Sequence, residues 1–305
     1  MTPDAGAVGH RLSIAIGTYP HTRALKADLR TLSSVPVDFA DVEPINRAFA
    51  PMVREQRFDI CELAIATFLQ AKAHGCPIVL LPAATACRFQ EAALICRMRD
   101  RSITGPRDLI GKRVGVRSYS QTTAVWLRGI LHDDFGVMPQ DILWTVTEPA
   151  HVREFVDPDF VRSAAGADLL ALLSQDQLDA VIVGNDKPES AELRPVFPDV
   201  GQAAARFKRV HGFEPVNHVI VARRDFVQSM PEAAVAFLDA IEASYGAADA
   251  DAARVPPLGR RDLQPSLDLA LRYAGEQHLM PRPLSVDEIW DGLTQIEPQL
   301  QERWP

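Results

Sequence analysis

Residues 104–136 read TGPRDLIGKRVGVRSYSQTTAVWLRGILHDDFG, and this stretch decides how the chain folds. A turn punctuated by glycine leads into a short β-type run from Arg113 to Val116, and a polar segment follows it. Apolar residues from Ala124 to Leu131 then recur at helical spacing before Gly136, which predicts an amphipathic helix with a glycine stop. A strand that leads into a helix start directs free backbone N–H groups and hydroxyls beyond the strand end. The stretch therefore predicts a site for an anion.

The polar segment supplies the candidate contacts to such an anion. Arg117 brings a cation, and several hydroxyls follow it in close succession. The residues that we expect to bind the ligand here are Arg117, Ser118, Tyr119, Ser120, Thr122 and Thr123. Because Ser118, Ser120 and Thr122 are also suitable helix caps, an ordinary capped helix without a ligand is the alternative interpretation.

The composition is typical of a soluble globular protein, and it does not favour nucleic acid or a membrane surface as a partner. The chain has 305 residues, of which 47% are hydrophobic and 24% charged, so it can hold two domains or one large one. A formal net charge of −8 gives no support for binding to nucleic acid or to a membrane surface, since both favour basic patches. The first eleven residues lack a cationic stretch followed by an apolar one, so we expect a cytoplasmic protein.

The four cysteines indicate neither a zinc site nor a disulfide framework. Cys61, Cys76, Cys87 and Cys96 are spaced by 15, 11 and 9 positions, which matches no metal or redox motif. We interpret them as buried free thiols, which suit a reducing compartment.

Short apolar runs alternate with helical stretches through the first third of the chain. These runs are Leu12 to Ile16, Val35 to Phe39, Phe58 to Leu63, Ile78 to Leu81 and Ala92 to Met98. Such alternation is typical of βαβ units on a parallel sheet.

A second α/β unit is predicted for about residues 100–215, followed by a last strand from Val216 to Ala222 and by helices from Pro231 onward. This order allows the chain to return to its first lobe. We therefore expect an α/β fold of two lobes, residues 1–99 with 219–305 and residues 100–218, joined by two crossings with a ligand cleft between them. Ligands of open α/β sheets bind beyond the carboxyl ends of strands. Besides the residues named above, the side chains at such ends are Tyr19, Glu62, Arg88, Asn185, Asn217 and His218.

Several segments, in the same order, resemble one known family. They include TYPHTRALKAD (residues 18–28), RFDICELAIATFL (57–69), GKRVGVRSYSQTTAVWLRGIL (111–131), DDFGVMPQDILW (133–144) and GFEPVNHVIVARRD (212–225). Over roughly residues 12–245 the chain is similar to the 4,5-dihydroxyphthalate decarboxylase family, a cytoplasmic branch of the type 2 periplasmic-binding-protein fold. The resemblance implies a carboxy-lyase of aromatic catabolism and phthalate degradation, which removes carbon dioxide from a dihydroxylated aromatic diacid, and it weakly implies a homo-oligomer.

The positions that match the family pattern are Tyr19, Arg23, Glu62, Arg88, Ser118, Thr122, Trp126, Arg128 and His218. The chain departs from the pattern at Gln90, Glu91, Glu214 and Asn217, where cationic or apolar residues are usual. Because these departures remove cations and add carboxylates, they leave the substrate open.

Decarboxylation of a phenolic acid without an organic cofactor needs a base for the phenolic proton, an acid for the ring carbon and cations for the retained carboxylate. We predict His218 and Glu62 as the catalytic residues, because imidazole titrates near neutrality and a carboxylate at a buried strand end is costly without a purpose. A hydrogen-bonded histidine at a strand start, and a carboxylate that caps the helix after Glu62, are the alternatives. We expect no cofactor, and a divalent metal held by His218, Glu62 and Glu91 is a minor alternative.

Two classes of function remain at this point. The first is a non-oxidative decarboxylase that acts on 4,5-dihydroxyphthalate or a relative by acid/base catalysis in the cleft. The second is a solute-binding or sensing protein that closes on a small organic anion without transforming it, related to the substrate-binding proteins of ABC transporters. Because both share the fold, the fold cannot decide between them.

Overall fold

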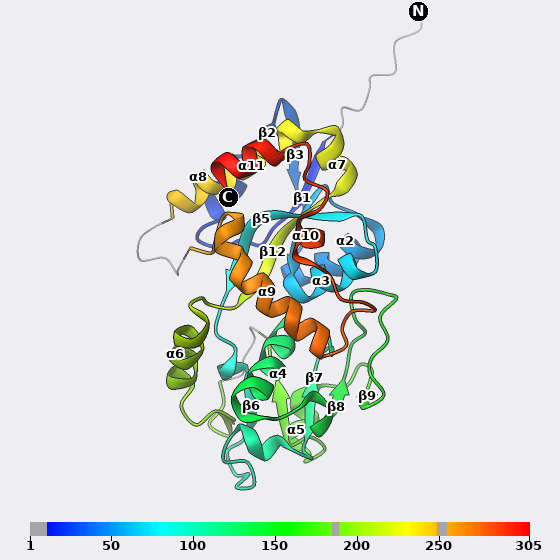
Figure 1. Cartoon of the computed structure of the whole chain (residues 1–305). Helices are drawn as coiled ribbons and strands as arrows, with labels where there is room; N and C mark the ends of the chain where they lie inside the picture. Colours follow the sequence, from blue (N-terminus) through cyan, green and yellow to red (C-terminus); the bar gives the residue numbers. More distant parts are fainter. Residues whose placement is uncertain (1–10, 185–188, 249–254) are drawn as a thin grey trace, which may run out of the picture.

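In the computed structural model, residues 11–184, 189–248 and 255–305 are described. Within these ranges the chain forms two lobes, one above the other, each built on a six-stranded sheet (Figure 1). The expected two-lobed α/β fold is confirmed, although Asn185 lies outside the described residues.

The first lobe holds a mixed sheet in which most strands are covered by helices on both faces. Its strand order is β2-β3-β1-β4-β12-β5, with β1 Leu12–Ala15, β2 Thr31–Leu32, β3 Val35–Phe39, β4 Ile60–Ala64, β5 Ile78–Cys87 and β12 Val216–Arg223. β1 pairs in parallel with β3 and β4, whereas β12 runs antiparallel to both of its neighbours. The sheet is therefore mixed, and β2 also runs antiparallel to its neighbour β3.

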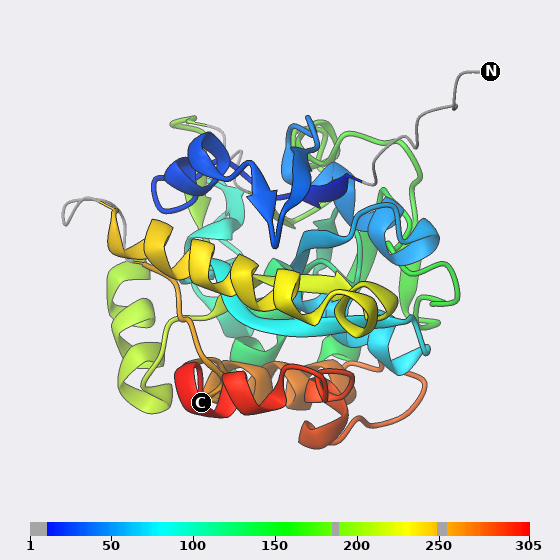
Figure 2. The ribbon, with the colours of Figure 1, turned by 90° about the horizontal axis from the view of Figure 1, so that it is seen from above.

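Helices cover this sheet because its strands alternate apolar side chains between two cores. Ile220 and Ala222 face one core, and Val219 and Val221 face the other. The helices of the first lobe are α1 Arg23–Asp28, α2 Phe49–Glu55, α3 Ile65–Ala73, α7 Arg224–Ser229, α8 Pro231–Gly246, α10 Val286–Trp290 and α11 Glu297–Arg303. Seen from above, α8 and the C-terminal helices lie to the two sides of the long strand β5 (Figure 2).

The second lobe has the strand order β11-β6-β10-β7-β8-β9. Its strands are β6 Leu94–Arg97, β7 Arg113–Val116, β8 Leu143–Val146, β9 Val161–Ser163, β10 Ala180–Ile182 and β11 Leu193–Pro195, and its helices are α4 Thr122–Phe135, α5 Leu169–Ser174 and α6 Val200–His211. Single 3₁₀ turns occupy Pro106–Leu109 and Pro139–Asp141 here, and Ile45–Ala48 and Glu91–Ala93 elsewhere. The predicted strand and helix of the opening stretch are confirmed, and the helix ends at Gly136 with φ 67°.

The boundary between the lobes differs from the expectation. We assigned Ala92 to Met98 to the first lobe, but β6 pairs antiparallel with β10 and β11 and belongs to the second sheet. The first crossing therefore lies at residues 88–93, and the second precedes Val216, not residue 219. An apolar run predicts a strand but carries no information on which sheet it joins, which explains the difference.

Helix α9 Arg260–Glu276 joins the two lobes a third time, because it packs against α3 and β5 of the first lobe and α4 of the second. It descends across the waist of the molecule in Figure 1. After its end, Gln277 accepts a hydrogen bond of 2.7 Å from Arg128 and donates one of 2.9 Å to the carbonyl of Val125. One continuous apolar core accordingly includes residues of both lobes.

Among the described residues, no helix combines the length and the apolar character needed to cross a membrane.

The close packing of α4 against α9 gives a test of this third junction. Gly129 has no room for a side chain, since a Cβ would lie 2.2 Å from the ring of Tyr273. We expect Gly129→Ala to lower the free energy of unfolding by about 1–3 kcal/mol, measured by urea denaturation, because overpacking outweighs the helix propensity of alanine. The matched control is Gly201→Ala in α6, where the nearest atom is 3.5 Å from a Cβ. It should change stability by no more than about 1 kcal/mol and in the stabilising direction. An equal effect of both variants would contradict the packing.

Candidate functional site

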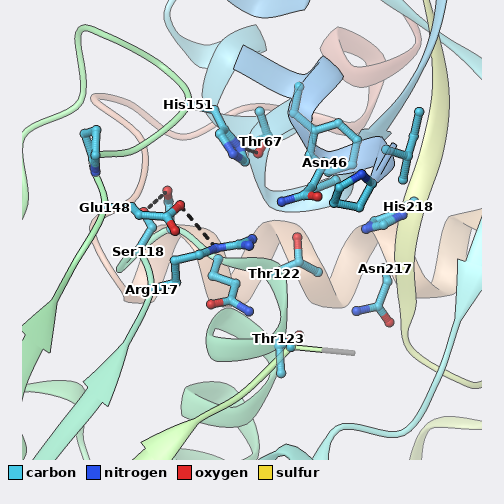
Figure 3. A pocket seen from close by; sticks show the side chains of 18 of the residues that line it. Asn46, Thr67, Arg117, Ser118, Thr122, Thr123, Glu148, His151, Asn217 and His218 are labelled. Atoms are coloured by element: carbon cyan, nitrogen blue, oxygen red, sulfur yellow. Dashed lines mark hydrogen bonds and ion pairs between the residues drawn. The ribbon is translucent and has the colours of Figure 1, made fainter. Parts of the chain in front are cut away.

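A pocket of about 200 Å³ lies between the lobes, where α3 and α4 begin (Figure 3). The first lobe and the crossings contribute Pro44, Ile45, Asn46, Phe49, Ala64, Thr67, Arg88, Asn217 and His218, and the second lobe contributes Arg117, Ser118, Ser120, Gln121, Thr122, Thr123, Glu148, Pro149, His151 and Gly184. The two walls touch, since the hydroxyl of Thr122 accepts a hydrogen bond of 3.2 Å from the backbone N–H of Ala66.

A buried carboxylate lies directly behind the first-lobe wall. Glu62 on β4 is fully buried, and its Oε1 is 2.6 Å from Nδ1 of His218 on β12 and 2.6 Å from the hydroxyl of Tyr19. Its Oε2 accepts the backbone N–H of Gly17 at 2.9 Å. A Cβ at Gly17 would lie 2.8 Å from the ring of Tyr19, so a larger residue there would displace the Tyr19 hydroxyl from Glu62. Glu62 itself does not line the pocket, and its carboxylate is held by three hydrogen bonds, one of which is to His218.

These hydrogen bonds decide the charge of the carboxylate. Burial alone would raise the pKa of Glu62, but His218, Tyr19 and the Gly17 N–H outweigh it and hold the pKa below its usual value. Burial, and then the neighbouring Glu62, raise the pKa of Tyr19, which keeps its hydroxyl protonated. An ionised carboxylate can only accept hydrogen bonds, so Nδ1 of His218 carries the proton that faces Glu62.

The other ring nitrogen of His218 is consequently available to the pocket. Among the described residues, no hydrogen bond uses Nε2 of His218. The ring is held edge-on against Phe49, with 5.2 Å between the ring centroids. Register shifts in the pairing of β12 with β5 fall on both sides of His218, and irregularities of this kind re-aim side chains at functional sites. In this arrangement a buried carboxylate orients an imidazole at the pocket.

The opposite wall of the pocket is the loop before α4, and a buried side chain on α4 holds its conformation. Arg128 is buried, donates a hydrogen bond of 2.6 Å to the carbonyl of Tyr119, and stacks 3.8 Å from the centre of the Tyr119 ring. This contact fixes the turn that presents Ser118 and Ser120 to the pocket. Arg117 at its rim has its Nε 3.4 Å from Oε2 of Glu148.

A further polar group sits at the first crossing. Arg88 lines the pocket and donates a hydrogen bond of 2.8 Å to the hydroxyl of Thr123. Beside it, the amide of Gln90 donates to Oδ1 of Asn217 at 2.8 Å and to the carbonyl of Arg88 at 2.6 Å. These bonds tie the crossing to β12 and hold the guanidinium of Arg88 next to the start of α4.

The predicted residues fall into three groups. Eight of them line the pocket, namely Arg88, Arg117, Ser118, Ser120, Thr122, Thr123, Asn217 and His218. Glu62 and Tyr19 lie behind His218, and Tyr119 lies behind the loop, so these three support the wall instead of lining it. Neither Ser118, Ser120 nor Thr122 caps α4; the cap position is Gln121, which makes no side-chain cap. Asn185 is outside the described residues.

The four departures from the family pattern are also placed by the structure. Only Asn217 lines the pocket, and Gln90 contacts it from behind. Glu91 is buried away from the pocket, and burial raises the pKa of its carboxyl. Glu214 does not line the pocket either. The carboxylate that does line the pocket is Glu148, for which no site role was predicted from the sequence.

His151 is the main functional candidate that the sequence did not reveal. It comes from the loop after β8, yet its Nδ1 is 2.9 Å from the hydroxyl of Thr67 on α3, and Arg54 on α2 donates a hydrogen bond of 2.7 Å to its carbonyl. Burial, with Arg117 and Arg54 nearby, lowers the pKa of His151 to about 4. The loop is therefore docked on the first lobe by a neutral imidazole. Thr67, Asn46 and Phe49 were missed as well, because they lie within helical or 3₁₀ segments that carry no motif.

The expected metal alternative gains no support from the geometry. Within the described ranges, one group of three side chains could share an ion, and it is His132, Asp133 and Glu276 on the surface of α4 and α9. Asp133 there is already paired with Arg272 at 2.5 Å. His218, Glu62 and Glu91 do not form such a group among the residues described.

The fold and the site define a class of protein: two α/β lobes of six strands each, with a polar pocket between them, form a type 2 binding-protein fold. Among solved structures, the periplasmic aliphatic sulphonate binding protein SsuA of Escherichia coli superposes with a TM-score of 0.53 at 12% identity, covering 96% of this chain and 92% of that one. At this identity the likeness concerns the fold alone.

The sequence comparisons narrow the class. The NMT1/THI5 like family matches residues 42–253, so the chain belongs to that family. A 4,5-dihydroxyphthalate decarboxylase of Comamonas testosteroni is 28% identical over 252 residues, 78% of this chain and 76% of the relative. A protein of the same name from Pseudomonas putida is 31% identical over 180 residues, 56% of this chain and 69% of the relative. The resemblance inferred from the sequence is thereby confirmed.

The buried carboxylate gives a stability test. We expect Glu62→Gln to lower the free energy of unfolding at pH 7 by about 1–3 kcal/mol, since an amide cannot accept hydrogen bonds from all three donors. Because the pKa of Glu62 is lowered in the fold, its stabilisation is present above the unfolded value of 4.5 and is lost as the pH falls through the folded value. The difference between wild type and variant, followed by denaturation, should therefore shrink in acid. Glu55→Gln on the surface is the control, and a comparable loss there would refute the role of burial.

The neutral imidazole of His151 gives a second, independent test. Its pKa falls from 6.5 unfolded to about 4 in the fold, so between these values the unfolded chain binds more protons and stability drops as the pH falls. From pH 7 to pH 5 we expect His151 to account for a loss of about 1–2 kcal/mol. His151→Gln should remove this part of the pH dependence in denaturation curves, whereas the exposed His278→Gln should retain it. Identical pH profiles for wild type and His151→Gln would rule the effect out.

Proposed function

We propose that the chain is a carboxy-lyase that releases carbon dioxide from a hydroxylated aromatic carboxylate bound between the lobes. The observation that carries the proposal is the Glu62–His218 pair, in which a buried, ionised carboxylate orients an imidazole whose Nε2 faces the pocket. The names of the two curated relatives support the same class of reaction. A cytoplasmic location is part of this proposal and rests on the sequence expectation.

The reaction needs a path for the electrons of the broken carbon–carbon bond. Nε2 of His218 accepts the proton of a ring hydroxyl para to the leaving carboxylate, and Glu62 stabilises the imidazolium that results. The ring carbon that bears the carboxylate takes a proton from water in the pocket, which converts the ring to a dienone. The carbon–carbon bond then breaks, its electron pair restores the aromatic ring, and the imidazolium returns its proton to the phenolate oxygen. One proton is consumed for each carbon dioxide released.

The polar wall holds the substrate while this happens. Arg88, which donates to Thr123, and the hydroxyls of Ser118 and Ser120 supply donors for a carboxylate oxygen. Phe49, beside His218, offers an apolar surface to a ring. Orientation of this kind places the ring hydroxyl at Nε2 instead of in solvent.

A solute-binding protein without chemistry is the second candidate. It is favoured by one observation, namely that two helix starts and several neutral hydroxyls face the pocket, an arrangement that suits the binding of an anion. The solved neighbour named for sulphonate binding shares this fold. The two candidates differ in one outcome, the release of carbon dioxide.

The experiment is an incubation of the purified chain with a panel of hydroxylated benzoates and phthalates, with carbon dioxide release and thermal stabilisation measured on the same samples. We expect at least one ligand that stabilises the chain to be decarboxylated. Stabilisation without carbon dioxide from any ligand, with and without added divalent metal, would leave the binding protein as the function.

For the ligand that turns over, His218→Asn should lower kcat by about 10²- to 10⁴-fold, because a general base contributes a factor of that order. Ligand-induced stabilisation should persist, since the carboxylate contacts come from Arg88, Ser118 and Ser120 and not from His218. The control is His278→Asn, an exposed histidine far from the pocket in sequence. Undiminished turnover in His218→Asn would remove His218 from the mechanism.

A further inference from the structure

Three side chains of permanent formal charge line the described pocket, histidines aside: Arg88, Arg117 and Glu148. Arg88 faces the start of α4 through Thr123. Arg117 and Glu148 form a pair at the opposite end of the polar wall, 3.4 Å apart (Figure 3). The pocket wall thus carries Arg88 beside Thr123, and an ion pair between Arg117 and Glu148.

Glu148 is fixed in place by the backbone around it. Its N–H donates to the carbonyl of Arg117 at 2.7 Å, and the N–H of Thr147 donates to the same carbonyl at 3.0 Å. Two residues further on, Arg54 of the first lobe binds the carbonyls of Ala150 and His151 at 2.8 and 2.7 Å. The loop is held at both ends, so the backbone of Glu148 stays beside Arg117, and its carboxylate pairs with that arginine.

We infer that Glu148 makes the pocket select an aromatic monocarboxylate over a dicarboxylate. A ligand carboxylate placed between Arg88 and the start of α4 is stabilised by the guanidinium charge and by the helix N-terminus. A second carboxylate on the same ring, in a pocket of about 200 Å³, would lie close to Glu148, where it meets a like charge and an arginine that is already paired. A hydroxyl or other donor in that place is instead stabilised by the carboxylate of Glu148.

The inference deepens the proposed function and rests on it only for the aromatic class of ligand. It assigns the second ring substituent to a hydroxyl facing Glu148, whereas the curated relatives are named for a diacid. Repulsion between Glu148 and a second ligand carboxylate acts on the dissociation constant. It can therefore be measured with ligands that lack the ring hydroxyl needed for the proposed decarboxylation.

The probes are benzoate and phthalate, which have the same ring without a hydroxyl and differ by one carboxylate. Dissociation constants are measured by calorimetry for wild type, Glu148→Gln and the control Glu154→Gln, which removes an exposed charge from the same loop outside the pocket. We expect wild type to bind benzoate more tightly than phthalate. Glu148→Gln should tighten phthalate binding about 5- to 20-fold and benzoate binding no more than about 2-fold, and added salt should reduce the change. Glu154→Gln should leave the ratio of the two constants unaltered.

Glu148→Ala provides a second variant should the amide rearrange, and the melting temperature without ligand shows that each variant is folded. An unchanged ratio in both folded Glu148 variants, or tighter binding of phthalate by wild type, overturns the inference. The outcome is separable from that of the proposed function. A shifted ratio without carbon dioxide release keeps the selectivity and removes the enzyme, while carbon dioxide release with an unchanged ratio does the reverse.

Discussion

The pairing of β12 between β4 and β5 is the constraint on which the rest of the molecule depends. The chain leaves the first lobe after β5, completes a second sheet, and returns as an antiparallel strand between β4 and the edge strand β5 of the first one. In this register Ile220 lies opposite Glu62, and His218 lies opposite Ala64. Glu62 and His218, which are 156 positions apart in sequence, therefore become neighbours, with Oε1 of Glu62 2.6 Å from Nδ1 of His218. Without this return there would be neither a second crossing nor the imidazole of His218 at the pocket.

Burial of the Glu62 carboxylate next to β12 carries a cost in free energy. Glu62 is withdrawn from water completely, which is unfavourable unless hydrogen bonds compensate for lost hydration. Three donors do so, and two of them, Tyr19 and the N–H of Gly17, come from the end of β1. The carboxyl ends of β1, β4 and the start of β12 are thus locked to one another by a single charged group. The other wall is organised in a similar way, since the buried Arg128 holds the loop before α4 through a backbone carbonyl.

The sequence predicted the two-lobed fold, the strand–helix junction and eight of the residues that line the pocket, because apolar runs and strand ends are local features. It could not assign β6 to a sheet, since pairing partners are set by the tertiary fold. It also could not separate Glu62 and Tyr19, which stand behind the wall, from His218, which forms it, because all three occupy strand ends. His151 and Glu148 come from a loop without periodicity, and their position follows from the docking of that loop on Arg54 and Thr67.

Helix α9 bears on how a ligand reaches the pocket. Two lobes joined only by two crossings can rotate about these crossings as a hinge. Here α3 of the first lobe and α4 of the second both pack against α9, so the lobes are also joined by this helix. Widening the gap between them requires these helices to slide along α9, and sliding of packed helices proceeds in small steps. A movement of the lobes that widens the pocket must therefore disturb the packing of α3 and α4 on α9. It must also break the hydrogen bonds that hold the loop carrying Glu148 and His151 on Arg54 and Thr67.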